Sequence, residues 1–529
     1  MENVMNALRG LLFLSALLLI TSCGGGSATS GEILHVSLLT ILPQFVFLTS
    51  GNSEQLSVSE KFNDGTVRTP HSPTWSSSDR KVAGVNSQGI VSALGAGAAT
   101  ITCTDQGITA STTVTVQPAF STRAYQSGTF LYLENAVGPD IIRLGMDSSF
   151  GGGVSEFSLN GSDVVAKASY GSHIIGLGLY DGNGTYDSCN GCTGTYGWNP
   201  VECCDTYRHG SPVLAQSITG TTIYIKTDAL EWIPDHKGGG PTQPVPSDII
   251  LERWFSPVAN HPYVFKERYK ITHTGTDRHA VQTNAVASYE ITAKLFDQFV
   301  AYTGNAARTG ASPTILQTSQ MPQWPVAGSV LLLSEGWGAF TNQQGFGFAA
   351  YSPQGFPYSA PNQATSDPTD QELGFSFFSP FSFTPGSSVQ FDTFLMQGNY
   401  TTMQWETYDI NRRLGPFVDI SPPLGDINST PANGSTVTGQ ISIDGWAFDS
   451  ISATHVDLYV DNVLIASGSA NITRPDIAMA YPGAPPDPAF HFVLDTTQLT
   501  NAMHVIEVRA TDLAGNVGLL PHRIVLVNN

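Results

Sequence analysis

The chain has 529 residues, of which 53 are glycine and 32 are proline, and only 12% are charged. Its formal net charge of -20 disfavours nucleic acid and anionic lipid as binding partners, because both are negatively charged. Apolar residues do not recur at helical spacing over long stretches, whereas Ser, Thr, Val and aromatic residues are abundant. We therefore expect an all-β protein of about three domains with few helices.

The N-terminus has the pattern of an export signal. An apolar run, LLFLSALLLI, follows Arg9 and is too short for the roughly 20 residues that cross a bilayer. The next residues, from Ile20 to Cys23, resemble the lipobox of bacterial lipoproteins, in which the signal is cut before a cysteine that then receives lipid. The resemblance implies a signal peptide over residues 1–22, lipid on Cys23 and a flexible tether over 23–33.

A lipoprotein of this kind is expected in the bacterial cell envelope, at the outer membrane or cell surface, with membrane contact through the lipid on Cys23 only. The alternative is ordinary secretion with a chance cysteine at this position.

Residues 34–118 form the first predicted domain. Short alternating runs and glycine turns predict a small β-sandwich, with Trp75 filling the core between its sheets. The segment resembles the group 2 bacterial immunoglobulin-like (Ig-like) domains. The matching residues are Gln55-Leu56, Trp75 to Ser78, Gly89 to Ala93, Gly95 to Gly97 and Ala99 to Thr102.

The middle segment, residues 119–416, is too long for one Ig-like sandwich and carries strand patterns throughout. Several strands show a strict two-residue alternation, as in the stretch that contains Phe265, Glu267, Tyr269 and Ile271. This period is typical of a sheet with one solvent-exposed face. We predict a large antiparallel β-supersandwich. The segment resembles the galactose mutarotase-like superfamily. The stretches that carry the resemblance include MDSSFGGGVSEFSLNGSDVV, YGSHIIGLGLYDG and SEGWGAFTNQQGFGFAAYSP.

Residues 417–529 form a third domain, predicted as a second Ig-like sandwich. It resembles bacterial Ig-like modules found at the ends of surface and carbohydrate-active proteins. The residues that carry this likeness are Gly445-Trp446-Ala447, Arg474-Pro475-Asp476, His504-Val505-Ile506 and Asp512 to Asn516.

Four cysteines lie within the segment SCNGCTGTYGWNPVECC: Cys189, Cys192, Cys203 and Cys204. In an oxidising compartment such a set predicts two disulfides. We expect each of the first two to pair with one of the last two, so that the loop becomes a rigid support for Tyr196 and Trp198. Zinc binding by the four thiols, or redox chemistry, remains an alternative.

The resemblance to galactose mutarotases implies a sugar site, because in such epimerases a histidine acid and a glutamate base act on the sugar ring. Sugar sites combine flat aromatic faces with carboxylates or amides. The candidate catalytic residues are Glu335, His173 and Glu290. The candidate substrate-binding residues are Trp337, Trp198, Tyr196, Asp205 and His209. We expect no cofactor and no metal.

The functional hypothesis is an exported, lipid-anchored surface protein whose middle segment binds carbohydrate or polysaccharide. If it is an enzyme, it would be a polysaccharide-active lyase, hydrolase or sugar epimerase. The alternative is a non-catalytic adhesin or structural surface protein with Ig-like stalk modules.

Overall fold

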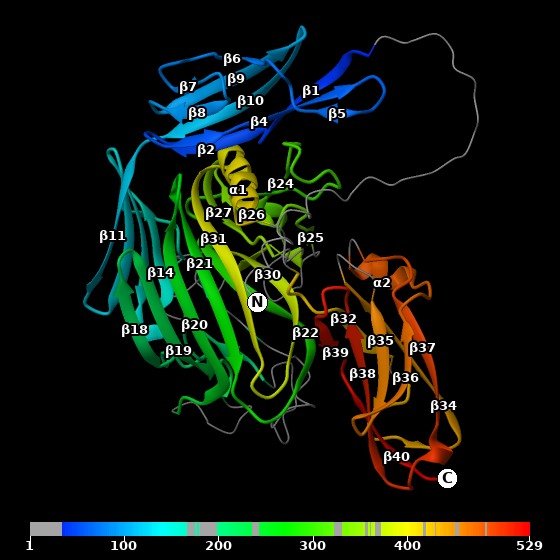
Figure 1. The fold of residues 1–529 in the computed structure, drawn as a ribbon. Coiled ribbons are helices and arrows are strands. Elements are labelled where there is room, and N and C mark those ends of the chain that lie inside the picture. The colour runs from blue at the N-terminus through cyan, green and yellow to red at the C-terminus, as the bar shows by residue number, and fades with distance from the viewer. Residues whose placement is uncertain are drawn as a thin grey trace, which may run out of the picture.

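The computed structural model describes residues 34–166, 175–176, 179, 198–234, 243–321, 331–354, 358–359, 361–364, 372–415, 419–428, 430–449, 454–481 and 484–529. Strands dominate these residues, so the predicted all-β class is confirmed. Figure 1 shows three bodies in chain order: a small sandwich in blue, a large two-sheet body in cyan to yellow, and a second small sandwich in orange and red. No helix in the described ranges combines the length and apolar character needed to span a bilayer.

The N-terminal sandwich packs a four-stranded sheet, ordered β2-β10-β9-β6, against two three-stranded sheets, β1-β4-β5 and β3-β8-β7. Its strands are β1 (Val36–Leu42), β2 (Phe45–Thr49), β3 (Ser53–Gln55), β4 (Ser57–Phe62), β5 (Val67–Arg68), β6 (Thr74–Ser77), β7 (Ala83–Val85), β8 (Ile90–Ala93), β9 (Gly97–Asp105) and β10 (Ile108–Gln117). Trp75 packs against the core, as predicted. Gly89 has a φ of +79°, and a Cβ there would lie 2.9 Å from the Trp75 ring, so only glycine fits this turn.

One large sheet of the middle body has eleven strands, ordered β11-β12-β13-β14-β16-β22-β30-β28-β25, with β15 and β29 at the side. The strands are β11 (Phe120–Ser127), β12 (Phe130–Val137), β13 (Asp140–Asp147), β14 (Gly153–Leu159), β15 (Ser162–Asp163), β16 (Ile175–Gly176), β22 (His279–Thr292), β25 (Leu331–Leu332), β28 (Tyr358–Ser359), β29 (Asn362–Ala364) and β30 (Glu372–Phe383).

The other large sheet has ten strands, ordered β17-β19-β20-β21-β31-β27-β26-β23-β24, with β18 beside β19. The strands are β17 (Pro200–Val201), β18 (Val213–Thr219), β19 (Thr222–Glu231), β20 (Pro246–Val258), β21 (His261–His273), β23 (Gln298–Ala301), β24 (Thr314–Gln317), β26 (Trp337–Thr341), β27 (Phe346–Tyr351) and β31 (Ser388–Asn399).

The two large sheets pack face to face through an aromatic core, as the alternating pattern predicts. Phe157 of β14 meets Phe265 of β21 and Phe348 of β27, with ring centroids 6.2 and 6.0 Å apart. All three side chains are fully buried, and each contributes roughly 1.5–3 kcal/mol by leaving water. Inward residues alternate with outward polar residues along β20 and β21, which leaves the outer face of the ten-stranded sheet polar.

Helix α1 (Tyr400–Leu414) fastens the middle body to the N-terminal sandwich, and Figure 1 shows it between them. It begins after Asn399, whose side chain accepts a hydrogen bond from the Thr401 amide at 3.0 Å. Near its C-terminal end, Arg412 and Arg413 bind the Glu54 carboxylate at 2.5 and 2.7 Å. This helix lies at the end of the predicted middle segment; few helices were expected, and none was placed here from the sequence.

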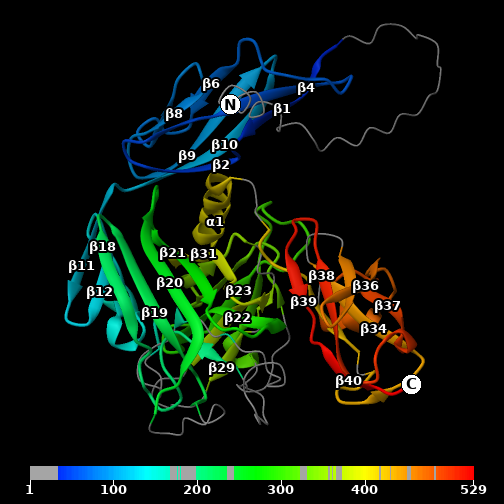
Figure 2. The same cartoon turned by 60° about the horizontal axis from the view of Figure 1, so that its bottom comes forward.

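The C-terminal sandwich pairs the sheet β32-β34-β37 with the sheet β33-β40-β38-β35-β36, to which β39 is added. Its elements are β32 (Leu424–Ile427), β33 (Thr436–Val437), β34 (Gln440–Phe448), β35 (His455–Val460), β36 (Val463–Ser469), α2 (Pro475–Ala480), β37 (Ala489–Asp495), β38 (Met503–Thr511), β39 (Val517–Leu519) and β40 (Arg523–Val527). Figure 2 shows it beside the middle body. Arg278 crosses this boundary to Glu507 at 3.1 Å.

Candidate functional site

The outer face of the ten-stranded sheet carries a half-buried aromatic pair. Tyr224 of β19 lies directly opposite Trp254 of β20, and their ring centroids are 5.2 Å apart. Both side chains are half-buried and point away from the core, because they alternate with the buried Ile223 and Phe255. We call this pair and the outward face of β19, β20, β21 and β31 around it the platform face.

Charged side chains continue the platform face across the sheet. In the row that contains Trp254, the next strands bring Arg268 and then Asp392. Arg268 donates to both oxygens of Asp392, at 2.7 and 3.0 Å, and Lys266 binds the same carboxylate at 2.7 Å. The flat aromatic surface therefore lies next to hydrogen-bond donors and acceptors held in place by ion pairs.

The neighbouring row is polar as well. Glu252 accepts from the Tyr224 hydroxyl at 2.8 Å and from Lys270 at 3.1 Å. Partial burial opposes ionisation of Glu252, but these two hydrogen bonds outweigh it and lower the pKa of the carboxyl. Burial and the Glu252 carboxylate raise the pKa of Tyr224 to about 12. At neutral pH the face thus presents a carboxylate and a neutral phenol, groups suited to binding.

Two shallow hollows flank the Trp254 side chain. One, of about 550 Å³, is lined by Ser217, Thr219, Thr222, Tyr224, Glu252 and Trp254. The other, of about 300 Å³, is lined by Trp254, Ser256, Lys266, Arg268 and Gln390. Trp254 separates two open compartments that are rich in hydroxyl, amide and charged groups. The arrangement suits an elongated polar ligand that lies across the sheet.

The predicted pair Glu335 and Trp337 is placed in the interior. Trp337 is fully buried in β26, and its indole Nε1 donates to Glu335 at 2.8 Å. Glu335, 2% exposed, also accepts hydrogen bonds from the Arg308 amide, the Tyr408 hydroxyl and the Gln404 amide. Trp337 therefore has no exposed ring on which a sugar could stack. The Glu335–Trp337 pair instead connects strand β26 to helix α1, through the hydrogen bonds from Gln404 and Tyr408 to Glu335.

The other predicted substrate-binding residues are also engaged within the protein. Trp198 is 2% exposed, so its ring does not face solvent. Asp205 is fully buried and accepts from the backbone amides of Tyr207 and His209, both at 2.9 Å, while its other oxygen binds the His209 ring at 2.7 Å. These contacts hold residues 205–209 in a local turn, so Asp205 is engaged by its own neighbours in the chain. Tyr196 and His173 lie outside the described residues.

The predicted disulfides are not found among the described residues. Cys203 and Cys204 are free thiols there, and their expected partners Cys189 and Cys192 lie outside the described residues, as does Cys23. The pairing stays a prediction. Cys103 is fully buried in the N-terminal core, and burial raises the pKa of its thiol to about 11.

Glu290, predicted as a catalytic residue, has a carboxyl neighbour. Burial, together with the Glu372 carboxyl, raises the pKa of Glu290 to about 8. A carboxyl that retains its proton near neutral pH can act as an acid or a base. Its catalytic role stays a prediction.

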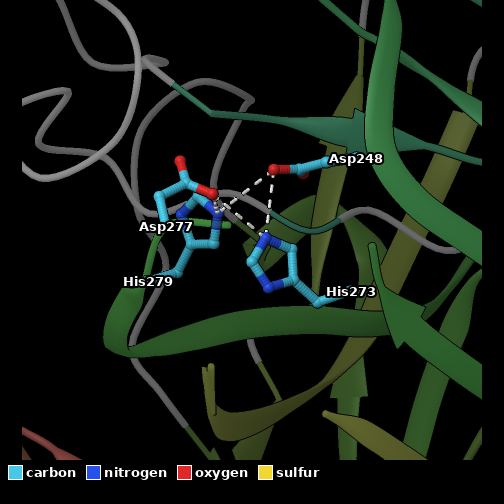
Figure 3. A group of neighbouring side chains, drawn as sticks. All are labelled: Asp248, His273, Asp277 and His279. Carbon is cyan, nitrogen blue, oxygen red and sulfur yellow. Dashed lines mark hydrogen bonds and ion pairs between the residues drawn. The ribbon is translucent and has the colours of Figure 1, made fainter. Parts of the chain in front are cut away.

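A group of two histidines and two aspartates gathers at one end of the middle body, and we call it the His–Asp cluster. It consists of Asp248, His273, Asp277 and His279. One potential ligand atom of each residue lies within 4.8 Å of all the others, and Figure 3 shows the two rings directed at the two carboxylates. Both rings are buried, whereas the aspartate side chains are 25% and 23% exposed.

The pKa values of His273 and Asp248 in the His–Asp cluster are shifted by burial and by the hydrogen bonds around them. Burial would lower the pKa of His273, but hydrogen bonds to Asp248 and to the Thr384 carbonyl outweigh it and raise the pKa. Burial likewise opposes ionisation of Asp248, yet hydrogen bonds from His273, His279 and Trp198 lower its pKa. None of the four residues of the cluster was predicted as a site from the sequence. The available signal was the run HTGTDRH, which places two histidines and an aspartate within seven residues.

Family comparisons identify the two small sandwiches. Residues 36–116 match the group 2 bacterial Ig-like domain, and residues 427–508 match a bacterial Ig domain. The chain carries two bacterial Ig-like domains. Both were predicted from the sequence, and both matches lie within the predicted segments 34–118 and 417–529. No curated protein matches the chain.

The solved structures to which this chain is similar in part include several carbohydrate-active proteins. An endo-β-1,4-mannanase from Thermotoga petrophila is 15% identical, with 24% of each chain covered and a TM-score of 0.16. A polysaccharide lyase is 10% identical over 77% of this chain and 47% of its own, with a TM-score of 0.29. This chain spans less than half the length of both proteins.

A further similar structure is a protein from Klebsiella pneumoniae subsp. pneumoniae that is assigned as an aldose 1-epimerase. It is 10% identical, covers 65% of this chain and 92% of its own length, and has a TM-score of 0.31. At these TM-scores no activity of the three proteins is transferred to this chain.

Proposed function

We propose that the protein binds carbohydrate on the platform face of its middle body. The observation that carries this proposal is the half-buried Trp254 ring, which points outward, adjoins Tyr224 and lies between two polar hollows. Sugar rings have apolar C–H patches that suit an aromatic face, while their hydroxyls need hydrogen-bond partners. The platform face offers both on one rigid sheet.

The shape of the platform face favours a polysaccharide over a single sugar. Its hollows are open and lie on opposite sides of Trp254, so consecutive sugar units can occupy both sides of the indole. The nearby Arg268 and Glu252 are each held by a partner, which keeps donors and acceptors in fixed positions without a large net charge. We therefore infer a binding function at this face.

We further propose that the chain is exported and lipid-anchored in a bacterial cell envelope. The support is the sequence from Ile20 to Cys23 and the apolar run before it. In this arrangement the N-terminal Ig-like domain lies between the lipid on Cys23 and the middle body, and would hold the platform face away from the membrane.

The test of the binding proposal is affinity electrophoresis of the full-length protein in gels that contain neutral or acidic polysaccharides. We expect Trp254→Ala to weaken binding by roughly five-fold or more, because an aromatic contact of this kind is worth about 1 kcal/mol. The variant should keep its fold, since the ring lies on the outer face of the sheet.

The matched control is Phe346→Ala, which removes an exposed ring, 41% accessible, from another strand of the same sheet and should leave binding unchanged. Retention of the wild type by none of the polysaccharides, or equal retention of wild type and Trp254→Ala, would contradict the proposal.

A further inference from the structure

The His–Asp cluster lies where the chain crosses from one large sheet to the other. His273 ends β21 in the ten-stranded sheet, and His279 begins β22 in the eleven-stranded sheet. Asp277 lies in the connection between them, and Asp248 comes from the start of β20. Potential ligands from both sheets thus converge at one edge of the sandwich (Figure 3).

We propose that the His–Asp cluster binds a divalent transition-metal cation of the zinc class, independently of the carbohydrate function. Four groups supply one ligand atom each, two imidazole nitrogens and two carboxylate oxygens. Four-coordinate sites of mixed nitrogen and oxygen ligands are characteristic of zinc. Calcium and magnesium prefer six or more oxygen ligands, so the two histidines disfavour them.

The spacing of the ligand atoms fits a tetrahedral site. Metal–ligand bonds of about 2.1 Å place tetrahedral ligands about 3.4 Å apart. His273 Nε2 lies 3.0 Å from Asp248 Oδ2 and 3.4 Å from Asp277 Oδ1. His279 Nε2 lies 3.8 and 4.0 Å from the same two oxygens. A cation can therefore replace direct contacts with only small side-chain movements.

The groups around the His–Asp cluster already orient the ligands. The Nδ1 of His273 lies 3.1 Å from the Thr384 carbonyl, so a proton on Nδ1 leaves the Nε2 lone pair directed at the cluster. Trp198 donates from its indole to Asp248 Oδ1 at 2.7 Å, which leaves Oδ2 for the cation. Its ring also stacks on His279 with centroids 3.6 Å apart. The hydrogen bonds of His273 and of Asp248 are of the kind that orients ligands in metal sites.

A glycine makes the convergence possible. Gly275 lies in the crossing connection, and a Cβ there would come within 2.3 Å of Asp248 Oδ2, 2.6 Å of His273 Nε2 and 2.7 Å of Asp277 Oδ1. Any side chain at this position would push the three ligand atoms apart. Its φ is not positive, so an alanine would disturb the cluster through this contact rather than through backbone strain.

A cation at this edge would join three parts of the protein. It would connect the two large sheets, and through Trp198 it would hold residues 198–204, the described end of the segment that carries the four cysteines. Arg278, between two ligands in sequence, binds Glu507 of the C-terminal sandwich. With four protein ligands and no open position, such a site has the character of a structural centre.

The test uses the full-length protein, with zinc chloride as the probe. We expect about one bound zinc per chain by elemental analysis, and the visible absorption of tetrahedral Co²⁺ after zinc is exchanged for cobalt. Chelation should lower the melting temperature. His279→Gln and Gly275→Ala should each reduce zinc affinity at least about ten-fold, and Trp198→Phe, which keeps a stacked ring, should weaken it about ten-fold.

Two controls make the result specific. His491→Gln alters a histidine–aspartate pair of the C-terminal sandwich and should leave zinc binding unchanged. Cys203→Ala should also retain the zinc, because no cysteine belongs to the His–Asp cluster. Zinc that is kept by His279→Gln and lost by Cys203→Ala would overturn the proposal, as would a folded wild type that binds neither zinc nor cobalt. If His279→Gln fails to fold, Gly275→Ala and Trp198→Phe decide the question.

Discussion

Replacing Glu335 with alanine is expected to lower the free energy of unfolding by about 4 kcal/mol. The carboxylate is 2% exposed and accepts from Trp337 at 2.8 Å, from the Arg308 amide at 2.7 Å, from Tyr408 at 2.5 Å and from Gln404 at 3.2 Å. Alanine leaves the Trp337 indole, the Tyr408 hydroxyl and the Arg308 amide without this acceptor, whereas Gln404 keeps its hydrogen bonds to the Ala311 carbonyl and the Tyr408 hydroxyl. Each buried unsatisfied group costs about 1–3 kcal/mol. Chemical denaturation of the full-length protein measures the change.

Glutamine at position 335 is expected to cost less, about 1–2 kcal/mol. The glutamine amide nitrogen can donate to the Tyr408 hydroxyl. Whichever carboxylate oxygen this nitrogen replaces, however, it faces at least one N–H group, that of Arg308 or that of Trp337, and an N–H group cannot accept a hydrogen bond. Asp487→Ala, which removes an exposed carboxylate, is the control and should change stability little. Unchanged stability of Glu335→Ala, with loss of polysaccharide binding, would instead support the sugar site predicted from the sequence at Glu335 and Trp337.

The free energy of unfolding is expected to fall as the pH rises, because the buried Glu267 must then lose its proton. Burial of this carboxyl between the sheets is the main cause that raises its pKa from the usual 4.5 to about 8. Arg253 lowers the pKa but lies 3.9 Å away and makes its close contact with Glu202, whose charge raises the Glu267 pKa further. Glu267 is therefore protonated in the folded protein at neutral pH.

The direction of this pH dependence follows from the difference in proton binding between the folded and the unfolded state. A carboxyl whose folded pKa is raised binds its proton more tightly in the folded state. Its contribution to stability is fully present below about pH 4.5 and is lost as the pH rises through about 8. One pKa unit corresponds to about 1.4 kcal/mol, so the loss over the whole shift is about 5 kcal/mol.

Glu267→Gln removes this titration and should flatten the decline in unfolding free energy between about pH 5 and pH 9. Glu252→Gln is the contrasting variant. The Glu252 pKa is lowered in the folded protein, so its contribution is present at neutral pH and lost as the pH falls. Its replacement should alter the acid side of the profile only. An unchanged alkaline decline in Glu267→Gln would show that Glu267 is not the responsible group.

Local patterns in the sequence predicted the β-sheet architecture, although they did not predict helix α1. Alternation of apolar and polar residues, as along Phe265 to Ile271, depends only on the two-residue period of a strand, and it predicted the large sheets. The two Ig-like domains were recognisable because their turns require particular residues, such as Gly89 beneath Trp75. Helix α1 was missed because its buried residues include polar ones such as Gln404, Glu406 and Asp409, which obscure an apolar stripe.

The candidate site depended on contacts that no local pattern contains. Trp254 and Trp337 both follow strand alternation, but only the packing of sheets and helix α1 leaves one ring at the surface and buries the other. Trp198 was expected to face a sugar and lies instead against His279.

Within HTGTDRH the spacing of His273, Asp277 and His279 was visible in the sequence, whereas Asp248 joins them only because β20 pairs with β21. The sequence by itself determined the periods of the strands and the residues at the turns, because these depend on neighbours along the chain. The tertiary structure decided which aromatic rings reach the surface and which polar groups meet, because those depend on residues far apart in the sequence, such as pairs 25 and 148 positions apart.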